Sequence, residues 1–178
     1  MSRRVIFSHG HLSSPESRKI QVLAPLARER GYAVEALDYR DLRDDPLGRI
    51  ERLAEHLAGL EEPPILVGSS MGGIVSMAAA ERYPVAGLFL LAPALFLEDR
   101  LPNMAVRECY QPRCQQIVLI HGWHDEVIPW QHSLRFSETS SAALHLIDAS
   151  HQLVDRLSII SALFAEFLEG CPDNGMPP

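Results

Sequence analysis

Two serines enclosed by glycines follow an apolar run in the segment ILVGSSMGG, residues 65–73. The pentapeptide GSSMG at 68–72 fits the pattern G-x-S-x-G, with Ser70 at its centre. That pattern presents a serine hydroxyl as a nucleophile on a tight turn between a strand and a helix. A chain of this length contains the pattern by chance in roughly one case in twenty. Ser70 therefore predicts nucleophilic chemistry only if a base and an acid accompany it, since it could otherwise serve only as a helix cap.

An acid and a base both follow Ser70 in the chain, each after an apolar run. Asp125 follows QIVLIHG (116–122), and His151 follows ALHLIDA (143–149). Histidine can accept the serine proton because its pKa lies near neutrality, and an aspartate can hold the imidazole in the right tautomer. The order serine, aspartate, histidine is that of the α/β-hydrolases. We therefore predict Ser70 as nucleophile, His151 as base and Asp125 as acid.

Other residues compete for the role of the acid. One is Asp148, which lies only three residues before the predicted base, and Asp99 and Glu98 are two more. Asp125 would then simply cap the segment that follows it. His151 also has an alternative interpretation, as a purely structural histidine.

A metal site is a further alternative, because four histidines lie near predicted strand ends in the motifs HGH and HGWHD. They are His9, His11, His121 and His124. However, His9 and His121 each precede a glycine at the end of a central strand, where this kind of fold makes tight turns in any case. We therefore predict no metal and no cofactor.

Backbone groups near the predicted nucleophile could stabilise a developing oxyanion. The N–H of Met71, at the start of the helix that follows Ser70, would be one donor. The N–H of His11, in the loop after the first strand, would be the second. Gly68 and Gly72 would allow the cramped turn around the serine.

The elements that must position these residues alternate between short apolar runs and amphipathic stretches. The runs predict strands at 3–10, 32–39, 64–69, 86–93, 116–122 and 143–149. The amphipathic stretches predict helices at 17–31, 45–60, 71–84, roughly 129–140 and 152–170. Apolar strands separated by helices predict an α/β fold, a mostly parallel six-stranded sheet covered on both faces. Ligands bind such a sheet at the carboxyl ends of its strands, where all the candidate residues lie.

Residues 94–114 do not fit this alternation, because the segment is long and mixes aromatic with charged residues. It is either a crossover helix extended by a small lid or an irregular surface connection. Leu12 and Trp123 are candidates for the wall of a substrate pocket, although such side chains are as often ordinary core.

Size and composition limit the classes of protein to consider. The chain has 178 residues, 47% of them hydrophobic and 22% charged, as expected for one globular domain at 1–170 followed by a flexible tail at 171–178. A net charge of −7 without a concentrated basic face argues against nucleic acid or a membrane as partner. Three irregularly spaced cysteines predict free thiols, and with no secretory signal or long apolar run we expect a cytoplasmic protein.

The chain resembles a minimal α/β-hydrolase, in particular the compact bacterial esterases of the YqiA/YcfP type. The resemblance is carried by HGHLSSPESRK (9–19), LVGSSMGG (66–73), DEV (125–127) and SH (150–151), and it is thin across 94–114. It implies hydrolysis of a small-molecule ester or thioester through an acyl-enzyme. The sequence has no obvious large cap domain, so we expect an open site that favours short or accessible acyl groups unless residues 94–114 cover it. The chain departs from the family in ASHQ, where an asparagine or glycine would be expected just before the histidine.

Two other functions compete with the serine hydrolase. One is a non-catalytic binding or regulatory protein on a hydrolase scaffold, since a fold does not fix a function. The other is a lyase or a haloperoxidase-like enzyme on the same scaffold. The sequence does not indicate the oligomeric state.

Overall fold

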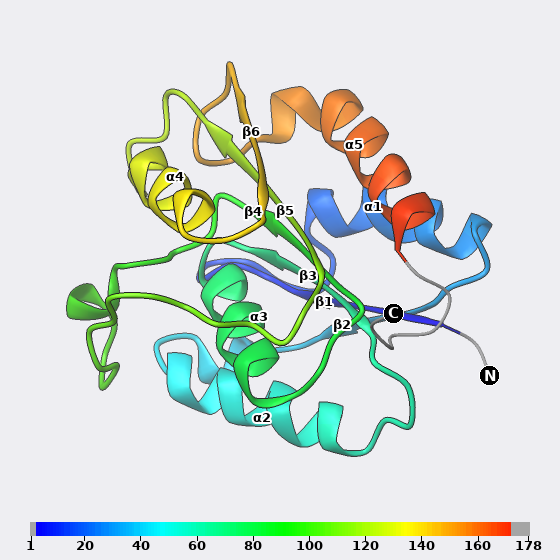
Figure 1. The fold of residues 1–178 in the computed structure, drawn as a ribbon, viewed down its shortest axis with the longest axis horizontal. Coiled ribbons are helices and arrows are strands. Elements are labelled where there is room, and N and C mark those ends of the chain that lie inside the picture. The colour runs from blue at the N-terminus through cyan, green and yellow to red at the C-terminus, as the bar shows by residue number, and fades with distance from the viewer. Residues whose placement is uncertain (1–2, 172–178) are drawn as a thin grey trace.

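The computed structural model describes residues 3–171, and its centre is one six-stranded sheet (Figure 1). The strands are β1 (Arg4–Ser8), β2 (Ala33–Leu37), β3 (Ile65–Ser69), β4 (Gly87–Leu91), β5 (Gln116–Gly122) and β6 (Ala143–Ile147). Their order is β2-β1-β3-β4-β5-β6, and every neighbouring pair is parallel. The predicted α/β fold with a parallel six-stranded sheet is therefore confirmed.

Helices cover both faces of the sheet. They are α1 (Arg18–Glu29), α2 (Pro46–Ala58), α3 (Met71–Arg82), α4 (Trp130–Glu138) and α5 (Leu157–Gly170). Helices α1 and α5 lie on one face, and α2, α3 and α4 lie on the other (Figure 1). None of the helices within residues 3–171 is long and apolar enough to cross a membrane. The predicted tail begins at Cys171, which is buried, and the rest of it lies outside the described residues.

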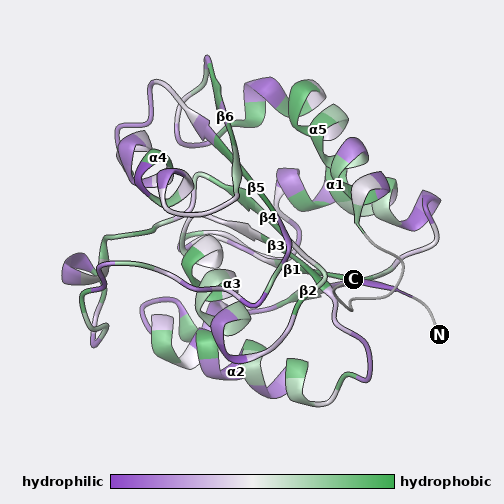
Figure 2. Cartoon of the chain, in the orientation of Figure 1, coloured by the Kyte–Doolittle hydropathy of each residue, from purple (hydrophilic) through white to green (hydrophobic). Residues whose placement is uncertain are grey.

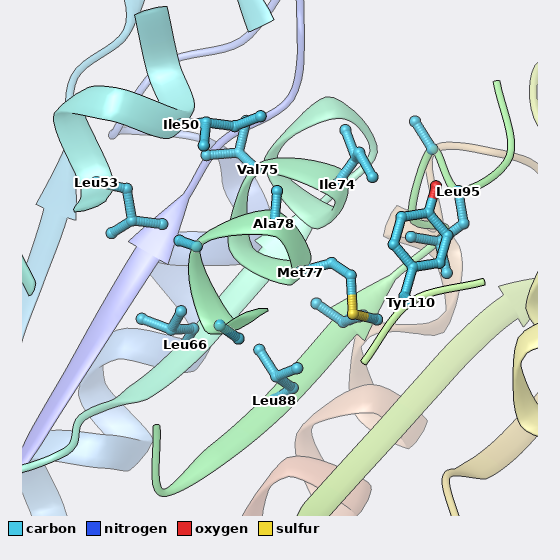
Figure 3. Close-up of a cluster of buried hydrophobic side chains, with 14 of the residues drawn as sticks. Ile50, Leu53, Leu66, Ile74, Val75, Met77, Ala78, Leu88, Leu95 and Tyr110 are labelled. Carbon is cyan, nitrogen blue, oxygen red and sulfur yellow. The ribbon is translucent and has the colours of Figure 1, made fainter. Parts of the chain in front are cut away.

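Two hydrophobic cores form because successive strand residues point to opposite faces of the sheet. In β1, Ile6 joins the core under α2 and α3, whereas Val5 and Phe7 join the core under α1 and α5. Figure 3 shows the first of these cores, where aliphatic side chains from α2 and α3 meet those of the central strands. Hydrophobic residues accordingly follow the strands, whereas each helix carries both kinds of residue (Figure 2). Burial on both faces explains why the strands read as apolar runs.

The connection between β4 and β5 is irregular and contains no crossover helix. Its only regular element is one 3-10 turn, η2 (Glu98–Arg100). Phe96 and Asn103 have φ angles of 56° and 61°, in the left-handed region. A right-handed helix cannot continue through residues in this conformation. The buried Tyr110 fixes the loop, because its hydroxyl accepts a hydrogen bond from the N–H of Phe96 at 3.0 Å. The segment 94–114 is thus an irregular connection without a crossover helix, and whether it acts as a lid stays a prediction.

The last helix starts later than predicted. Leu153, at a φ of 59°, precedes a 3-10 turn, η3 (Val154–Arg156), so that α5 begins at Leu157 and not at residue 152. Strands β1, β2, β4 and β6 are each shorter than their predicted ranges. These differences release the chain just beyond the carboxyl ends of the strands, where the candidate residues lie.

Candidate active site

Ser70 occupies a sharp turn between β3 and α3. Its φ of 55° and ψ of −118° are unfavourable for any residue with a side chain and cost about 1–3 kcal/mol. Surrounding hydrogen bonds stabilise the turn: Ser70 N–H donates to the carbonyl of Leu91, and the Ser70 carbonyl accepts from the N–H groups of Gly73 and Ala94. No side-chain bond from Ser70 caps α3, which argues against the helix-cap interpretation.

Gly68 and Gly72 fit the turn because a side chain at either position would collide with backbone. A Cβ on Gly68 would overlap the carbonyl oxygen of Gly72, and a Cβ on Gly72 would overlap that of Ser8. The contact at Gly72 brings α3 against the end of β1, at the place where the strand order changes direction between β1 and β3. This switch point is where open α/β sheets bind their ligands.

Ser70, His151 and Asp125 form one chain of hydrogen bonds. The Ser70 hydroxyl lies 3.1 Å from His151 Nε2, and His151 Nδ1 lies 2.8 Å from Asp125 Oδ2. The His151 ring is mostly buried, with 16% of its side chain exposed, and the Asp125 side chain is fully buried. Residues separated by 81 positions in the sequence thus meet at the carboxyl edge of the sheet.

Four donors surround the Asp125 carboxylate. Burial by itself raises the pKa of this carboxyl, but hydrogen bonds outweigh burial and hold the pKa well below its usual range. Two of the donors are the imidazoles of His121 and His151, and two are the N–H groups of Ile128 and Val127. The carboxylate is therefore a fixed negative charge facing the His151 ring.

His121 is a partner of Asp125 that the sequence interpretation did not find. Its buried ring donates from Nε2 to Asp125 Oδ2 at 3.0 Å and to the Ile128 carbonyl at 3.1 Å. Its Nδ1 lies 2.8 Å from the hydroxyl of the buried Ser133 on α4. Strand alternation was the available signal, because it puts His121 on the same buried face as Leu119.

The competing residues have other partners. Asp148 is exposed and bonds to His124 and Arg156, not to His151. Asp99 is exposed on η2, and the side chain of Glu98 lies outside what the structure describes.

The four histidines weighed as metal ligands are bound separately. The partners of His9, His11, His121 and His124 are respectively the Tyr39 N–H, Asp44, Asp125 and Asp148. Within residues 3–171 no three histidine, cysteine or acidic side chains come close enough to hold one metal ion.

A buried arginine, also missed from the sequence, holds the loop after β1. Arg49 on α2 is fully buried and forms no ion pair within the described residues. Its guanidinium donates five hydrogen bonds to backbone carbonyls, those of Leu42 (2.8 Å), Arg43 (3.1 Å), His9, Gly10 and His11 (3.3 Å each). Three consecutive carbonyls of the loop are thus drawn toward one side chain.

These contacts orient the peptide between Gly10 and His11. The Gly10 oxygen accepts from Arg49 and also from His9 Nδ1 at 2.8 Å, while His9 Nε2 accepts from the Tyr39 N–H. Burial lowers the pKa of His9, in keeping with a neutral ring. Because the peptide is planar and trans, the His11 N–H points away from the side on which the Gly10 oxygen is held. Neither this N–H nor that of Met71 has a hydrogen-bond acceptor within residues 3–171.

Two cavities adjoin Ser70. The larger, about 470 Å³, is mainly apolar and is partly walled by the β4–β5 connection; its lining includes Met71, Ala94, Leu97, Leu101 and Ile128. The smaller, about 310 Å³, is more polar, and its lining includes Leu12, Ser13, Ser17, Lys19, His151 and Gln152. Ser70 and His11 line both. Trp123 lines neither of these two cavities and packs edge-on against Trp130 at a centroid distance of 4.9 Å.

Known proteins share this fold. Residues 5–114 match the sequence model of the alpha/beta hydrolase family. A protein from Xanthomonas campestris pv. campestris, assigned to the hydrolases of the alpha/beta superfamily, is 30% identical with a TM-score of 0.82, covering 94% of this chain and 98% of that one. No curated protein sequence matches significantly.

More distant structures resemble the chain in fold alone. An alpha-beta serine hydrolase homologue from Coxiella burnetii is 23% identical, with a TM-score of 0.74 over 94% of this chain and 85% of that one. Est1E from Butyrivibrio proteoclasticus is 18% identical, with a TM-score of 0.74 over 94% and 87%. The narrower resemblance to esterases of the YqiA/YcfP type stays a prediction.

Proposed function

The chain belongs to the alpha/beta hydrolase family, and from this membership we propose that it is a serine hydrolase that cleaves a carboxylic ester or thioester. The observation that carries the proposal is the hydrogen-bond chain from the Ser70 hydroxyl through His151 to the buried Asp125. A hydroxyl is a weak nucleophile at neutral pH, and an adjacent imidazole held by a carboxylate is the arrangement that activates it.

The reaction proceeds in two halves. Ser70 Oγ attacks the carbonyl carbon while His151 Nε2 takes its proton, and Asp125 stabilises the imidazolium that results. The oxyanion receives hydrogen bonds from the N–H groups of Met71 and His11. The bond from the carbonyl carbon to the leaving oxygen or sulfur then breaks, and His151 gives its proton to the leaving group. Water, deprotonated by His151, attacks the acyl-enzyme and releases the acid and Ser70.

A fluorophosphonate probe tests the nucleophile, because it reacts with activated serines and not with ordinary ones. We expect wild type to label and Ser70→Ala not to label, while the matched control Ser69→Ala, one residue away, keeps its labelling. A folded wild type that fails to label would favour the non-catalytic alternative. Labelling of Ser70→Ala as strong as that of wild type would mean that the nucleophile is misassigned.

Esters of p-nitrophenol with rising acyl length test the acyl site. A volume of about 470 Å³, walled on one side by the β4–β5 connection, suits short and medium acyl chains. We expect kcat/KM to fall for long chains, and an optimum at long chains would contradict this expectation.

A further inference from the structure

Lys19 is the only lysine of the chain, among 16 basic residues, and it lines the smaller cavity beside Ser70. It belongs to the segment HLSSPESRK, to which the hydrolytic mechanism gives no role beyond the backbone of His11. Two more side chains of that segment, Ser13 and Ser17, line the same cavity. The segment therefore supplies most of the polar groups on one side of the nucleophile.

The position of His151 assigns the two cavities to the two halves of a substrate. The residue that protonates the leaving group must reach the leaving atom, and His151 lines the smaller cavity but not the larger. The smaller cavity is thus the side from which the leaving group departs. The larger cavity, with Met71 and Ile128 in its apolar wall, is then the side of the acyl group.

Lys19 is a cation without an anionic partner in this cavity. Its ammonium group donates one hydrogen bond, to the carbonyl of Gln152 at 2.9 Å, and within residues 3–171 it forms no ion pair. An ammonium group has three donors, so two are left for a ligand. Burial lowers the pKa of Lys19, and the nearby charge of Asp125 opposes that effect only in part. A partly buried charge of this kind is stabilised by an anion that binds beside it.

We propose that the smaller cavity binds a leaving group that carries a carboxylate or a phosphate, and that Lys19 recognises this charge. The inference rests on the proposed function, because it concerns the leaving group of the same Ser70 reaction. The substrate is then an ester or thioester whose alcohol or thiol half is anionic. The anion takes no part in the bond changes, and the leaving group departs with the proton that His151 donates.

Three butyrate esters that differ only in the leaving group test this proposal. They are 3-carboxyphenyl butyrate, 3-phosphonooxyphenyl butyrate and the neutral 3-carbamoylphenyl butyrate, which has nearly the same shape as the carboxylate. We expect wild type to prefer at least one anionic ester over the neutral ester by about tenfold in kcat/KM, which equals about 1.4 kcal/mol. The better of the two anionic esters identifies the kind of anion.

Variants attribute the preference to one side chain. Lys19→Met is expected to remove the tenfold preference, and Lys19→Arg, which keeps the charge, to retain most of it. The matched control is Arg18→Met, an exposed charge one residue away that lines neither cavity, and it should leave the preference unchanged. The proposal is overturned if wild type hydrolyses the neutral ester in a Ser70-dependent way but shows no preference for the anionic esters. The proposed serine hydrolase function would still stand after that result.

A binding measurement makes the test independent of catalysis. Reductive ¹³C-methylation gives a single lysine NMR signal, since Lys19 is the only lysine. In Ser70→Ala we expect 3-hydroxybenzoate or 3-hydroxyphenyl phosphate to shift this signal and to raise the pKa of Lys19, and 3-hydroxybenzamide to do neither. If neither anion shifts the signal, the cavity does not recognise a charged leaving group and the proposal is wrong.

Discussion

Replacing Arg49 by methionine removes the guanidinium that binds five carbonyls of the two loops at 9–11 and 42–43. Methionine has a similar length and no polar hydrogen, so the carbonyls lose their donor while the space stays largely filled. At about 1 kcal/mol for each hydrogen bond, the loss is about 5 kcal/mol. Burial lowers the pKa of Arg49, so the charge itself is costly to bury, and its removal returns about 1–2 kcal/mol.

We therefore expect Arg49→Met to lower the free energy of unfolding by about 3–4 kcal/mol. A domain of this size has about 5–15 kcal/mol available, so the variant should still fold at 25 °C. The matched control is Arg52→Met on the same helix. Arg52 is partly exposed and pairs with Asp41 at the surface, where such a pair contributes about 0–1 kcal/mol. Urea unfolding of both variants measures the difference.

Activity separates positioning from stability. Without Arg49 the peptide that carries the His11 N–H is held on one side only by His9, so the proposed oxyanion donor loses its orientation. Loss of one such donor lowers kcat by about 10²–10³-fold. We expect a fall of about 10²-fold in kcat for Arg49→Met, with little change in KM. Arg49→Lys should fall between it and wild type, because an ammonium group cannot bind five separated carbonyls.

Three results would refute this reasoning. If Arg49→Met is as stable as wild type, the five hydrogen bonds do not hold the loops. If the variant is destabilised as expected but keeps kcat within threefold of wild type at full folding, Arg49 supports the fold without positioning the oxyanion donor. A rise in KM with unchanged kcat would likewise contradict the assignment, because the proposed donor acts on the transition state and not on substrate binding.

Two further changes test the acid and the turn. Hydrogen bonds hold the pKa of Asp125 below its ordinary value of 3.8. The ionised carboxylate therefore contributes its full stabilisation of the fold above pH 3.8, and this contribution is lost as the pH falls toward the lower folded-state pKa. Asp125→Asn should make the free energy of unfolding less dependent on pH in this range, and an unchanged dependence would contradict the assignment. Gly72→Ala would force a Cβ into a backbone carbonyl, so it should lower the free energy of unfolding by about 1–3 kcal/mol and remove most fluorophosphonate labelling. The control Gly59→Ala should be tolerated, because the nearest atom to its Cβ would be 3.6 Å away. Equal unfolding curves for the two variants would show that the turn has room for a side chain.

The fold was predictable from the sequence because both faces of the sheet are buried. The central strands β3 and β4, which have two buried faces, are almost wholly apolar, and most of the helices between the strands are amphipathic, so the class and the element order follow from the hydrophobic pattern. The residue pattern around Ser70 identified the turn in the same way, since glycine at 68 and 72 meets a steric requirement. The loop at 94–114 was not predictable, because its left-handed residues and its anchor Tyr110 act through tertiary contacts.

Arg49 shows why part of the site escaped the sequence interpretation although a signal existed. Helical periodicity places it four residues before Leu53 and eight before Leu57, on the buried stripe of α2. A charged residue on an apolar stripe is expected to have buried partners. Those partners are backbone carbonyls, which have no sequence signature, so the pattern could indicate that Arg49 is bound but not to which loop.

Lys19 differs because no hydrophobic periodicity marks it, although it ends the segment HGHLSSPESRK that carries the family resemblance. Its contact with Gln152 joins residues 133 positions apart, because the loops after β1 and β6 end at the same edge of the sheet and α1 and α5 pack together on the same face. Parallel topology predicts that the loops after β1 and β6 lie at the same edge of the sheet. Whether their residues line the same cavity depends on how many residues separate each strand from the helix that follows it. The late start of α5 leaves the loop at 150–153 free to reach the first turn of α1. The proposed specificity of the site therefore depends on helix boundaries, the feature that sequence patterns define least well.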